Sequence, residues 1–407
     1  MTLISVSVFA ESKVELIKDS SGQDISAPIA RVLTNAYGTF AIAKAGVVDR
    51  KLQNAPIYID LKNKGVFKQL DLDYSQLFPL HAYERVDVLE NTLRQSMTVS
   101  KIDGKYVIYA GISVYLADYR KDVYGRGFPK YRNILFNYSL LSYLYEIRFN
   151  EKGDPVVSAS VNTQNVVYPF LHSVDNIVLN AGLRGQYNYP VVFDDNWIDK
   201  LPADGISFCE ILGPWRCDAE NGWDVAQFNN ISGEVTTEAE VVANLKTGLT
   251  LVGSNHGLFY KDYSDWWHEM PTVALQNAVV NPNAMDRFTT HVYVGTTRGL
   301  EVAEMNIDNW PNPGDWNWGQ EALLPNDDIV SVARSVHFLA VGTENNGLYI
   351  YPLDEKGDVK TGDNPINIRP EQIDPGVNDI TIASLSVIKD RLYVATNKGL
   401  YQVALSN

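Results

Sequence analysis

The chain has 407 residues and a formal net charge of −15 at pH 7, with 45% hydrophobic and 11% aromatic residues. This acidic balance argues against general nucleic-acid binding and against an anionic membrane surface as a partner. No apolar run approaches the roughly 18 residues of a membrane-spanning helix, so we expect no insertion into a membrane.

The first 26 residues contain two short stretches of alternating apolar and polar residues, Leu3–Phe9 and Val14–Ile17. No Lys or Arg precedes the first stretch, and it is too short for a usual signal peptide. We therefore expect closing strands here. We also expect a protein of a virion or a cytoplasmic assembly, with secretion or a periplasmic location less favoured.

Residues 27–75 and 76–155 each contain several short apolar runs and predict the first two repeats, of which the first is degraded. Residues 156–230 are the least regular part and predict a third repeat with a long insertion. Cys209 and Cys217 lie in this insertion on either side of a Gly-Pro turn. They could form a disulfide across a hairpin or remain two reduced thiols.

One segment of the second repeat opposes the global charge. Residues 119–132 carry five basic residues and one acidic residue, a local charge of +4, interleaved with aromatic residues. This segment is an ordinary exposed loop between repeats, a protein-contact surface, or a site for a polyanion or glycan, and the sequence leaves the three readings open. The candidate binding residues are Arg120, Lys121, Tyr124, Arg126, Phe128, Lys130, Tyr131 and Arg132.

The C-terminal third repeats one phrase four times, as in Tyr293–Glu301 and Tyr393–Tyr401. Each copy has an apolar run, a polar turn with glycine, and a second apolar run. Its Gly-Leu steps lie 42, 48 and 52 residues apart (299−257, 347−299, 399−347). The glycine would supply the positive φ of a tight hairpin, and the first run should be buried on both faces.

Segments around the phrase predict the other strands of each repeat. Asn326–Val332 and Val377–Ala383 predict the innermost strands, and tryptophan-rich segments predict the outermost ones. Four strands in series favour a β-propeller over a sandwich or closed barrel. The remaining repeats would cover residues 231–272, 273–322, 323–373 and 374–407. We expect a single all-β propeller domain over 1–407, of seven blades (six or eight remaining open), with its ring closed by the N-terminal strand.

The tryptophans at the outer strands divide into two groups. Trp266 and Trp316 should pack between neighbouring sheets. Trp310 and Trp318, beside prolines and asparagines, should be more exposed and are candidates for stacking on a sugar.

A short phrase links the two halves of the chain. Leu144-Tyr145 followed by Glu151–Asp154 matches Leu348-Tyr349 followed by Glu355–Asp358, with an offset of 204 in both (348−144, 355−151). The match supports one architecture throughout.

The phrase Val294–Leu300 and its relatives resemble the repeats of the two-component-regulator propellers. The resemblance covers about the last 180 residues well and the rest weakly, and it concerns the fold. It implies a ligand-sensing or carbohydrate-binding propeller as one possible role.

Chemical motifs give little further direction. We find no metal-ligand histidine pattern, nucleophile elbow or phosphate loop, and we expect no cofactor and no catalytic residues. The aspartates at 194, 195, 199 and 204 could hold Ca²⁺, but without the spacing of a known loop they are more typical of a solvated surface. The leading hypothesis is a non-enzymatic platform for other protein subunits, such as a phage tail or capsid-associated protein. The alternatives are a carbohydrate- or ligand-binding sensor and a glycan hydrolase or lyase with channel carboxylates.

Overall fold

The structure is a computed structural model of the 407-residue chain. It describes residues 12–19, 21–35, 38–44, 47–48, 51–52, 55–60, 67–72, 86–88, 94–102, 105–118, 138–162, 171–174, 177–184, 187–193, 223–225, 240–242, 249–261, 267–288, 291–305, 316–319, 322–360, 364–377, 379–389 and 391–405. Two compact units divide the chain. Unit 1 comprises Met1–Ala43, Tyr58–Gln69 and Asn229–Asn407, and unit 2 comprises Lys44–Ile57 and Leu70–Phe228.

The described residues form antiparallel sheets with one short helix, α1 (Pro370–Ile373). No helix among them is long and apolar enough to cross a membrane. The prediction of an all-β chain built from four-stranded antiparallel sheets is therefore confirmed.

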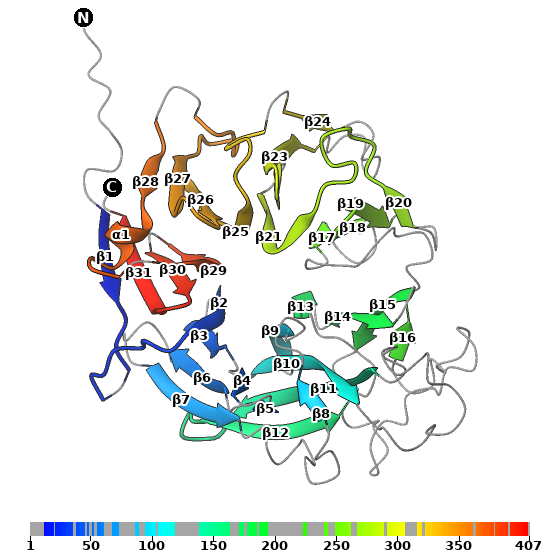
Figure 1. The fold of residues 1–407 in the computed structure, drawn as a ribbon, viewed down its shortest axis with the longest axis vertical. Helices are drawn as coiled ribbons and strands as arrows, with labels where there is room; N and C mark the ends of the chain where they lie inside the picture. Colours follow the sequence, from blue (N-terminus) through cyan, green and yellow to red (C-terminus); the bar gives the residue numbers. More distant parts are fainter. Residues whose placement is uncertain are drawn as a thin grey trace, which may run out of the picture. The chain divides into compact units, whose positions relative to one another are not determined.

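Three sheets of unit 1 repeat one plan, in which four consecutive strands lie in chain order (Figure 1). The first contains β17 (Glu240–Val242), β18 (Leu249–Ser254), β19 (Gly257–Lys261) and β20 (Trp267–Glu269). The second contains β21 (Val280–Phe288), β22 (His291–Thr296), β23 (Gly299–Glu304) and β24 (Asn317–Trp318). The third contains β25 (Ile329–Arg334), β26 (Phe338–Thr343), β27 (Leu348–Pro352) and β28 (Ile366–Ile368).

The next sheet joins the two ends of the chain. It contains β29 (Ile382–Ile388), β30 (Arg391–Thr396) and β31 (Gly399–Leu405), and its fourth strand is β1 (Ser12–Leu16). All five residues of β1 pair with β31, from Ser12 opposite Leu405 to Leu16 opposite Tyr401. The predicted strand Val14–Ile17 thus lies within or beside β1, and Leu3–Phe9 lies outside the described residues.

A further sheet follows β1 along the chain. It contains β2 (Ile29–Asn35), β3 (Gly38–Ala43), β6 (Ala55–Asp60) and β7 (Phe67–Leu72), of which β6 and β7 have residues in both units.

The repeated phrase forms the second and third strands of each C-terminal sheet. The glycine that opens each third strand, or precedes it, has positive φ: 139° at Gly257, 126° at Gly299, 81° at Gly347 and 145° at Gly399. Every residue of β22 and β26 is buried. Both expectations drawn from the phrase, the glycine turn and the doubly buried strand, are confirmed.

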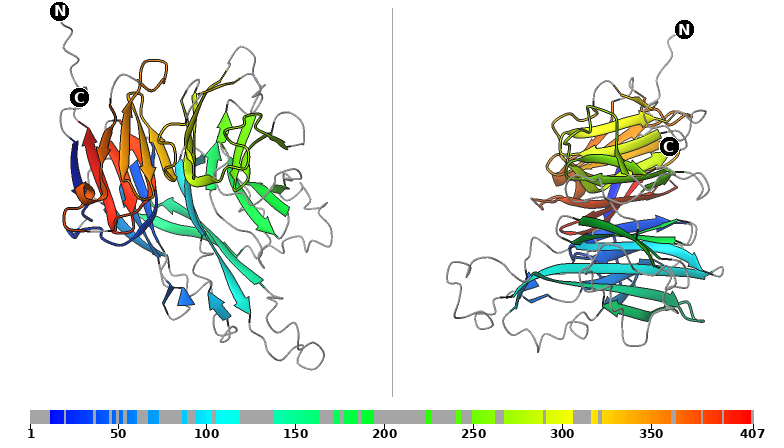
Figure 2. Two further views of the ribbon diagram at one scale, coloured as in Figure 1. Left: turned by 45° about the horizontal axis from the view of Figure 1, so that its top comes forward. Right: turned by 90° about the vertical axis from the view of Figure 1, so that its right-hand side faces the viewer.

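Consecutive sheets of unit 1 pack face to face, as the stacked layers in Figure 2 show. Small residues allow this approach. A Cβ added to Gly295 on β22 would lie 2.6 Å from Cγ2 of Ile329 on the next sheet, and one added to Gly342 on β26 would lie 2.9 Å from Cγ2 of Ile382. Ile329 and Ile382 open β25 and β29, so the same contact recurs between successive sheets.

The first strands of neighbouring sheets are joined by buried hydroxyls. β25 and β29 each bulge after their first residue, which brings Ser331 and Ser384 to the same place in the two strands. Ser331 Oγ donates to Asn283 O (3.0 Å) and accepts from Leu385 N (2.9 Å), which links β21, β25 and β29. Ser384 Oγ donates to Val32 O (3.3 Å) and so links β29 to β2.

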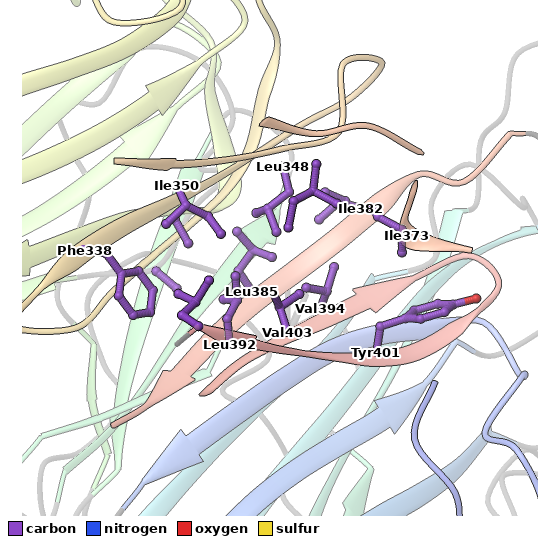
Figure 3. Packing of buried hydrophobic residues seen from close by; sticks show 14 of the residues in the cluster. Phe338, Leu348, Ile350, Ile373, Ile382, Leu385, Leu392, Val394, Tyr401 and Val403 are labelled. Atoms are coloured by element: carbon purple, nitrogen blue, oxygen red, sulfur yellow. The ribbon is translucent and has the colours of Figure 1, made fainter. Parts of the chain in front are cut away.

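A large apolar cluster lies between the sheets of β25–β28 and β29–β31 (Figure 3). Phe338, Leu348 and Ile350 meet Leu392 and Val403 across this interface, and α1 adds Ile373. Burial of such side chains is the main favourable contribution to folding. Tyr401 also belongs to the cluster, and its hydroxyl donates a hydrogen bond to Asp374 Oδ2 (2.7 Å).

Unit 2 contains two larger sheets and a small hairpin. The first sheet has β8 (Val86–Val88), β9 (Arg94–Ile102), β10 (Lys105–Asp118), β11 (Tyr138–Phe149) and β12 (Pro155–Asn162). The second has β13 (Leu171–Val174), β14 (Ile177–Arg184), β15 (Tyr187–Phe193) and β16 (Trp223–Val225), and β13 contacts β9. The hairpin is β4 (Val47–Val48) with β5 (Lys51–Leu52).

The tetrapeptide shared by the two halves forms the same tight turn in both units. Asn150 Oδ1 accepts from Lys152 N (3.0 Å) and Asp154 N (2.9 Å), and Asp354 Oδ1 accepts from Lys356 N (2.8 Å) and Asp358 N (2.9 Å). The glycines of these turns have φ of 77° and 97°. In both turns an Asn or Asp side chain accepts hydrogen bonds from the backbone N–H groups two and four residues later. This shared geometry explains why the phrase recurs.

Candidate binding face of unit 1

The hairpin turns that follow the second strands of the C-terminal sheets share one hydrogen-bonded frame. At Thr296, Oγ1 donates to Gly299 O (3.0 Å) and accepts from Arg298 N (3.0 Å). The same pair of bonds is made by the buried hydroxyls of Ser254, Thr343 and Thr396. In each turn the hydroxyl thus hydrogen-bonds two backbone groups, one carbonyl and one amide.

We expect Thr396→Val to lower the free energy of unfolding by about 1–3 kcal/mol, because two backbone groups lose their buried partner. Valine keeps the shape and the β-propensity of threonine, so the effect isolates the hydroxyl. Thr396→Ser keeps both bonds and should be much closer to wild type. Urea unfolding of the three proteins measures the difference, and equal midpoints for valine and serine variants would contradict the expectation.

The loops that lead into the first strands carry a second repeated feature. Asn277, Asn326 and Asp379 have φ of 53°, 72° and 67°, and each lies three residues before its strand, at Val280, Ile329 or Ile382. Asn and Asp adopt this left-handed conformation more readily than other residues with a Cβ. The left-handed conformation is therefore favoured by the Asn or Asp that stands at the same position in each of these three loops.

Backbone hydrogen bonds tie these loops to the hairpin turns. Asn277 N donates to His256 O and Asn326 N to Arg298 O, both at 3.2 Å. Glu344 N also donates to Asp328 O (2.9 Å). Turns and loops thus form one surface at this end of the sheets. We call it the turn face and define it as the hairpin turns 254–257, 296–299, 343–347 and 396–399 with the loops 276–279, 324–328 and 379–381.

The exposed side chains of the turn face differ from one turn to the next. His256 and Arg298 are exposed in two turns, and Glu344, Asn345 and Asn346 are exposed in the third. The buried frame of hydroxyl and glycine is the same in all four turns. A constant frame that presents varied side chains is typical of a binding surface.

Polar contacts fix several of these side chains in place. Asn346 Nδ2 donates to Asp327 Oδ1 (2.5 Å), and Lys398 Nζ lies 3.3 Å from Asp379 Oδ2. Arg298 Nη2 donates to Gln276 O (3.1 Å). Side chains held in this way lose less conformational freedom when a partner binds.

Glu301 is a buried carboxyl beside the turn face. It lies on β23 two residues after Gly299 and is 7% exposed, whereas the equivalent residues of the other sheets are Phe259, Tyr349 and Tyr401. Burial raises the pKa of Glu301 above its ordinary value, and the charge of Arg298 acts in the opposite direction. The ionised form is therefore disfavoured in the folded protein.

This raised pKa predicts a pH dependence of stability. The folded state binds the proton of Glu301 more tightly than the unfolded state, whose carboxyl titrates near about 4.3. The contribution of Glu301 is therefore most favourable below that pH and declines as the pH rises through the raised pKa. We expect Glu301→Gln to increase Tm near neutral pH and to flatten this decline. Glu304→Gln, at an exposed position of the same strand, is the control. A lower Tm for Glu301→Gln at neutral pH would contradict the prediction.

Most of the site residues predicted from the sequence lie outside the described part of the chain. The basic segment 119–132, Trp310, both cysteines and the aspartates at 194–204 lie outside the described residues. In the sequence, the basic segment lies between β10 and β11. The described pairing of these two strands ends at Ala117 opposite Tyr138.

Trp316 and Trp318 belong to one cluster, and Trp266 lies outside the described residues. Trp316 is buried at 6% exposure, as expected, and packs with Met270, Met305 and Leu275. Trp318 lies on β24 and is half-buried against this cluster, with its ring 6.4 Å from that of Trp316. Its Nε1 is buried and makes no hydrogen bond within the described part of the chain.

Within the described ranges, no group of three or more His, Cys, Asp or Glu side chains is arranged to hold a metal ion. His291, which begins β22, instead contacts the neighbouring sheet: its Nε2 lies 3.0 Å from Asp358 Oδ1, and Tyr293 donates to Gly357 O (2.7 Å). Burial raises the pKa of Tyr293 well above its ordinary value. These contacts hold the Asp354 turn against the preceding sheet.

No protein-family model matches the sequence, and no similar sequence is found among curated proteins. The fold has clear counterparts. The WD40 β-propeller domain of Doa1 aligns with a TM-score of 0.50 over 98% of this chain and 97% of that domain, at 9% identity.

The chain has a β-propeller fold. Two further structures align less closely. The computationally designed protein Ika8 gives a TM-score of 0.45 at 10% identity, over 97% of this chain and 100% of that one. The β-propeller domain of the Trilobed protease from Pyrococcus furiosus, described as having an open velcro topology, gives 0.42 at 9% identity over 93% of each chain. At 9% identity, the alignment with the Doa1 domain shows the fold and no function.

Within the propeller, each repeated sheet is a blade and the turn face is one end of its blades. The hydroxyl of the turn frame is a feature that the sequence also carries, since each phrase has Ser or Thr three or four residues before its glycine. The sequence does not show the role of this hydroxyl. The structure does, because the hydroxyl hydrogen-bonds both the glycine carbonyl and a turn amide.

Proposed function

We propose that this propeller is a non-enzymatic platform that binds other protein subunits through the turn face of unit 1. The observation that carries the proposal is the combination of an invariant buried frame with exposed side chains that change from blade to blade. A rigid scaffold with varied loop residues is the usual basis of selective protein binding.

The architecture we propose for this platform is one domain of seven blades, with the ring closed through the N-terminal strand. Seven sheets of four or five strands among the described residues, and the pairing of β1 with β31, support it. The setting we propose is a larger assembly, most concretely a virion. Sedimentation of the native protein free of any particle would count against the virion setting.

A second contact is proposed at the basic segment 119–132. Its local charge of +4 on a chain of −15 would favour an acidic protein partner. Replacing Arg120, Lys121 and Arg126 by Glu should then weaken binding, most strongly at low ionic strength.

The platform is tested by co-purification of the native protein with and without changes on the turn face. Glu344→Lys with Asn345→Lys changes two exposed residues between β26 and β27. Val336→Lys with His337→Lys, in the exposed turn between β25 and β26, is the control at the opposite end of the same blade. We expect partners to be lost only from the first variant. Identical partners on both variants, or none on the wild type, would contradict the proposal.

Carbohydrate binding at Trp318 is the second candidate. The half-buried ring of Trp318 favours it, because sugars stack on the partly exposed face of an indole. Glycan-array binding that is lost in Trp318→Phe at unchanged Tm would support it. Binding retained by that variant would exclude Trp318 as the site.

A further inference from the structure

Asn346 combines a reactive sequence with an open position on the turn face. It is exposed, and it is followed by Gly347, which has no side chain to cover the peptide nitrogen. Asn345 is followed by Asn346, and Asn397 by Lys398. These neighbours give two matched positions on the same face whose following nitrogen is shielded.

Gly347 is buried, but no hydrogen bond within the described residues holds its nitrogen. The Gly347 carbonyl accepts from both Thr343 N and Thr343 Oγ1, each at 2.9 Å, which holds the peptide in place. The N–H of Gly347 donates to no acceptor among the described residues. Its φ of 81° is a conformation that glycine adopts freely.

We propose that Asn346 is a site of spontaneous deamidation, which converts an exposed carboxamide of the turn face into a carboxylate. Base removes the proton of Gly347 N, and this nitrogen attacks Cγ of Asn346. The new N–Cγ bond closes a succinimide, the Cγ–Nδ2 bond breaks, and ammonia leaves with a proton from solvent. Water then opens the ring at either carbonyl and gives aspartate or isoaspartate. Water is the only co-reactant.

The products would change the turn face in two ways. Asp327 Oδ1 would lose the Nδ2–H donor and gain a neighbouring carboxylate of like charge. Isoaspartate would also add a methylene to the main chain immediately before Gly347, a residue so closely packed that a Cβ added to it would lie 2.3 Å from Ile368 O. The chemistry is independent of the proposed function, whereas an effect on partner binding rests on it.

Peptide mapping of the folded protein, held warm at mildly alkaline and mildly acidic pH, tests the site. We expect the deamidated fraction at Asn346 to grow several-fold faster than at Asn345 or Asn397, and faster at the higher pH. The pair Asn221-Gly222 gives a reference in the same digest. Asn346 that stays intact in the folded protein but deamidates in the guanidinium-unfolded protein would overturn the proposal, because the fold would then protect it.

Two variants separate the modification from its consequence. Asn346→Gln keeps a carboxamide and should show no comparable conversion, and conversion at an equal rate would contradict the succinimide route. Asn346→Asp imitates one product and should lower Tm relative to wild type. Deamidation without any change in co-purifying partners would leave the modification established and would argue against this turn as part of the binding surface.

Discussion

We expect Gly399→Ala to destabilise the protein by several kcal/mol, because strain and steric conflict coincide at this residue. The φ of Gly399 is 145°, which residues with a Cβ rarely adopt, and the added carbon would lie 2.3 Å from Ile25 O. That oxygen is a backbone atom fixed by accepting from Leu400 N (3.1 Å). Backbone strain of about 1–3 kcal/mol and overpacking of about 1–3 kcal/mol therefore add.

Gly376→Ala is the matched control for this change. Gly376 also has positive φ, 93°, but nothing lies within 4 Å of an added Cβ. Its substitution should show only the strain of about 1–2 kcal/mol. Thermal and urea unfolding of the two variants separate strain from steric conflict. Equal losses of stability would mean that the N-terminal segment around Ile25 moves aside.

The second large effect is expected at Gly295, where alanine should cost about 1–3 kcal/mol by overpacking the contact between blades. The added Cβ would meet Ile329 Cγ2 at 2.6 Å and Ala284 Cβ at 2.8 Å, and a Cβ atom cannot rotate away. Gly342→Ala meets Ile382 Cγ2 at 2.9 Å and its other neighbours at 3.4 Å or more, so its cost should be smaller.

Compensation distinguishes overpacking from a change in backbone flexibility. Ala284→Gly removes one of the two obstructing carbons, so the double variant with Gly295→Ala should be more stable than the sum of the single effects predicts. Urea midpoints of the four proteins complete the cycle. Strict additivity would show that the two residues, on neighbouring strands of one blade, do not oppose each other.

Local sequence features predicted the repeated blades well because their signals lie within a few residues. Gly299 and Gly399 fall where a hairpin needs positive φ, and the apolar run ending at Thr296 is buried throughout. The role of Gly295 could not be predicted in this way, since its small size serves a contact with Ile329 on another blade. Sequence spacing alone cannot distinguish a turn glycine from a packing glycine.

The bounds of the strands could not be predicted from the sequence, because they depend on which strands pair and in which register. Asp328-Ile329 resembles Asp379-Ile380, yet the bulged pairing equates Ile329 with Ile382, because both lie opposite the last residue of the next strand. Similarly, β12 (Pro155–Asn162) crosses the expected division at residue 155, since it pairs with β11. The turn face needs loops and turns from separate blades to meet, and no local pattern specifies that meeting.

The pairing of β1 with β31 has a consequence for the order in which the protein matures. Ser12 and Leu405 are 393 positions apart (405−12), so β1 is synthesised long before its neighbour β31. Until β31 has been made, β1 has no edge to join, and closing so long a loop is entropically unfavourable. A nascent chain stalled before residue 391 lacks β30 and β31, so its β1 should be open to proteolysis.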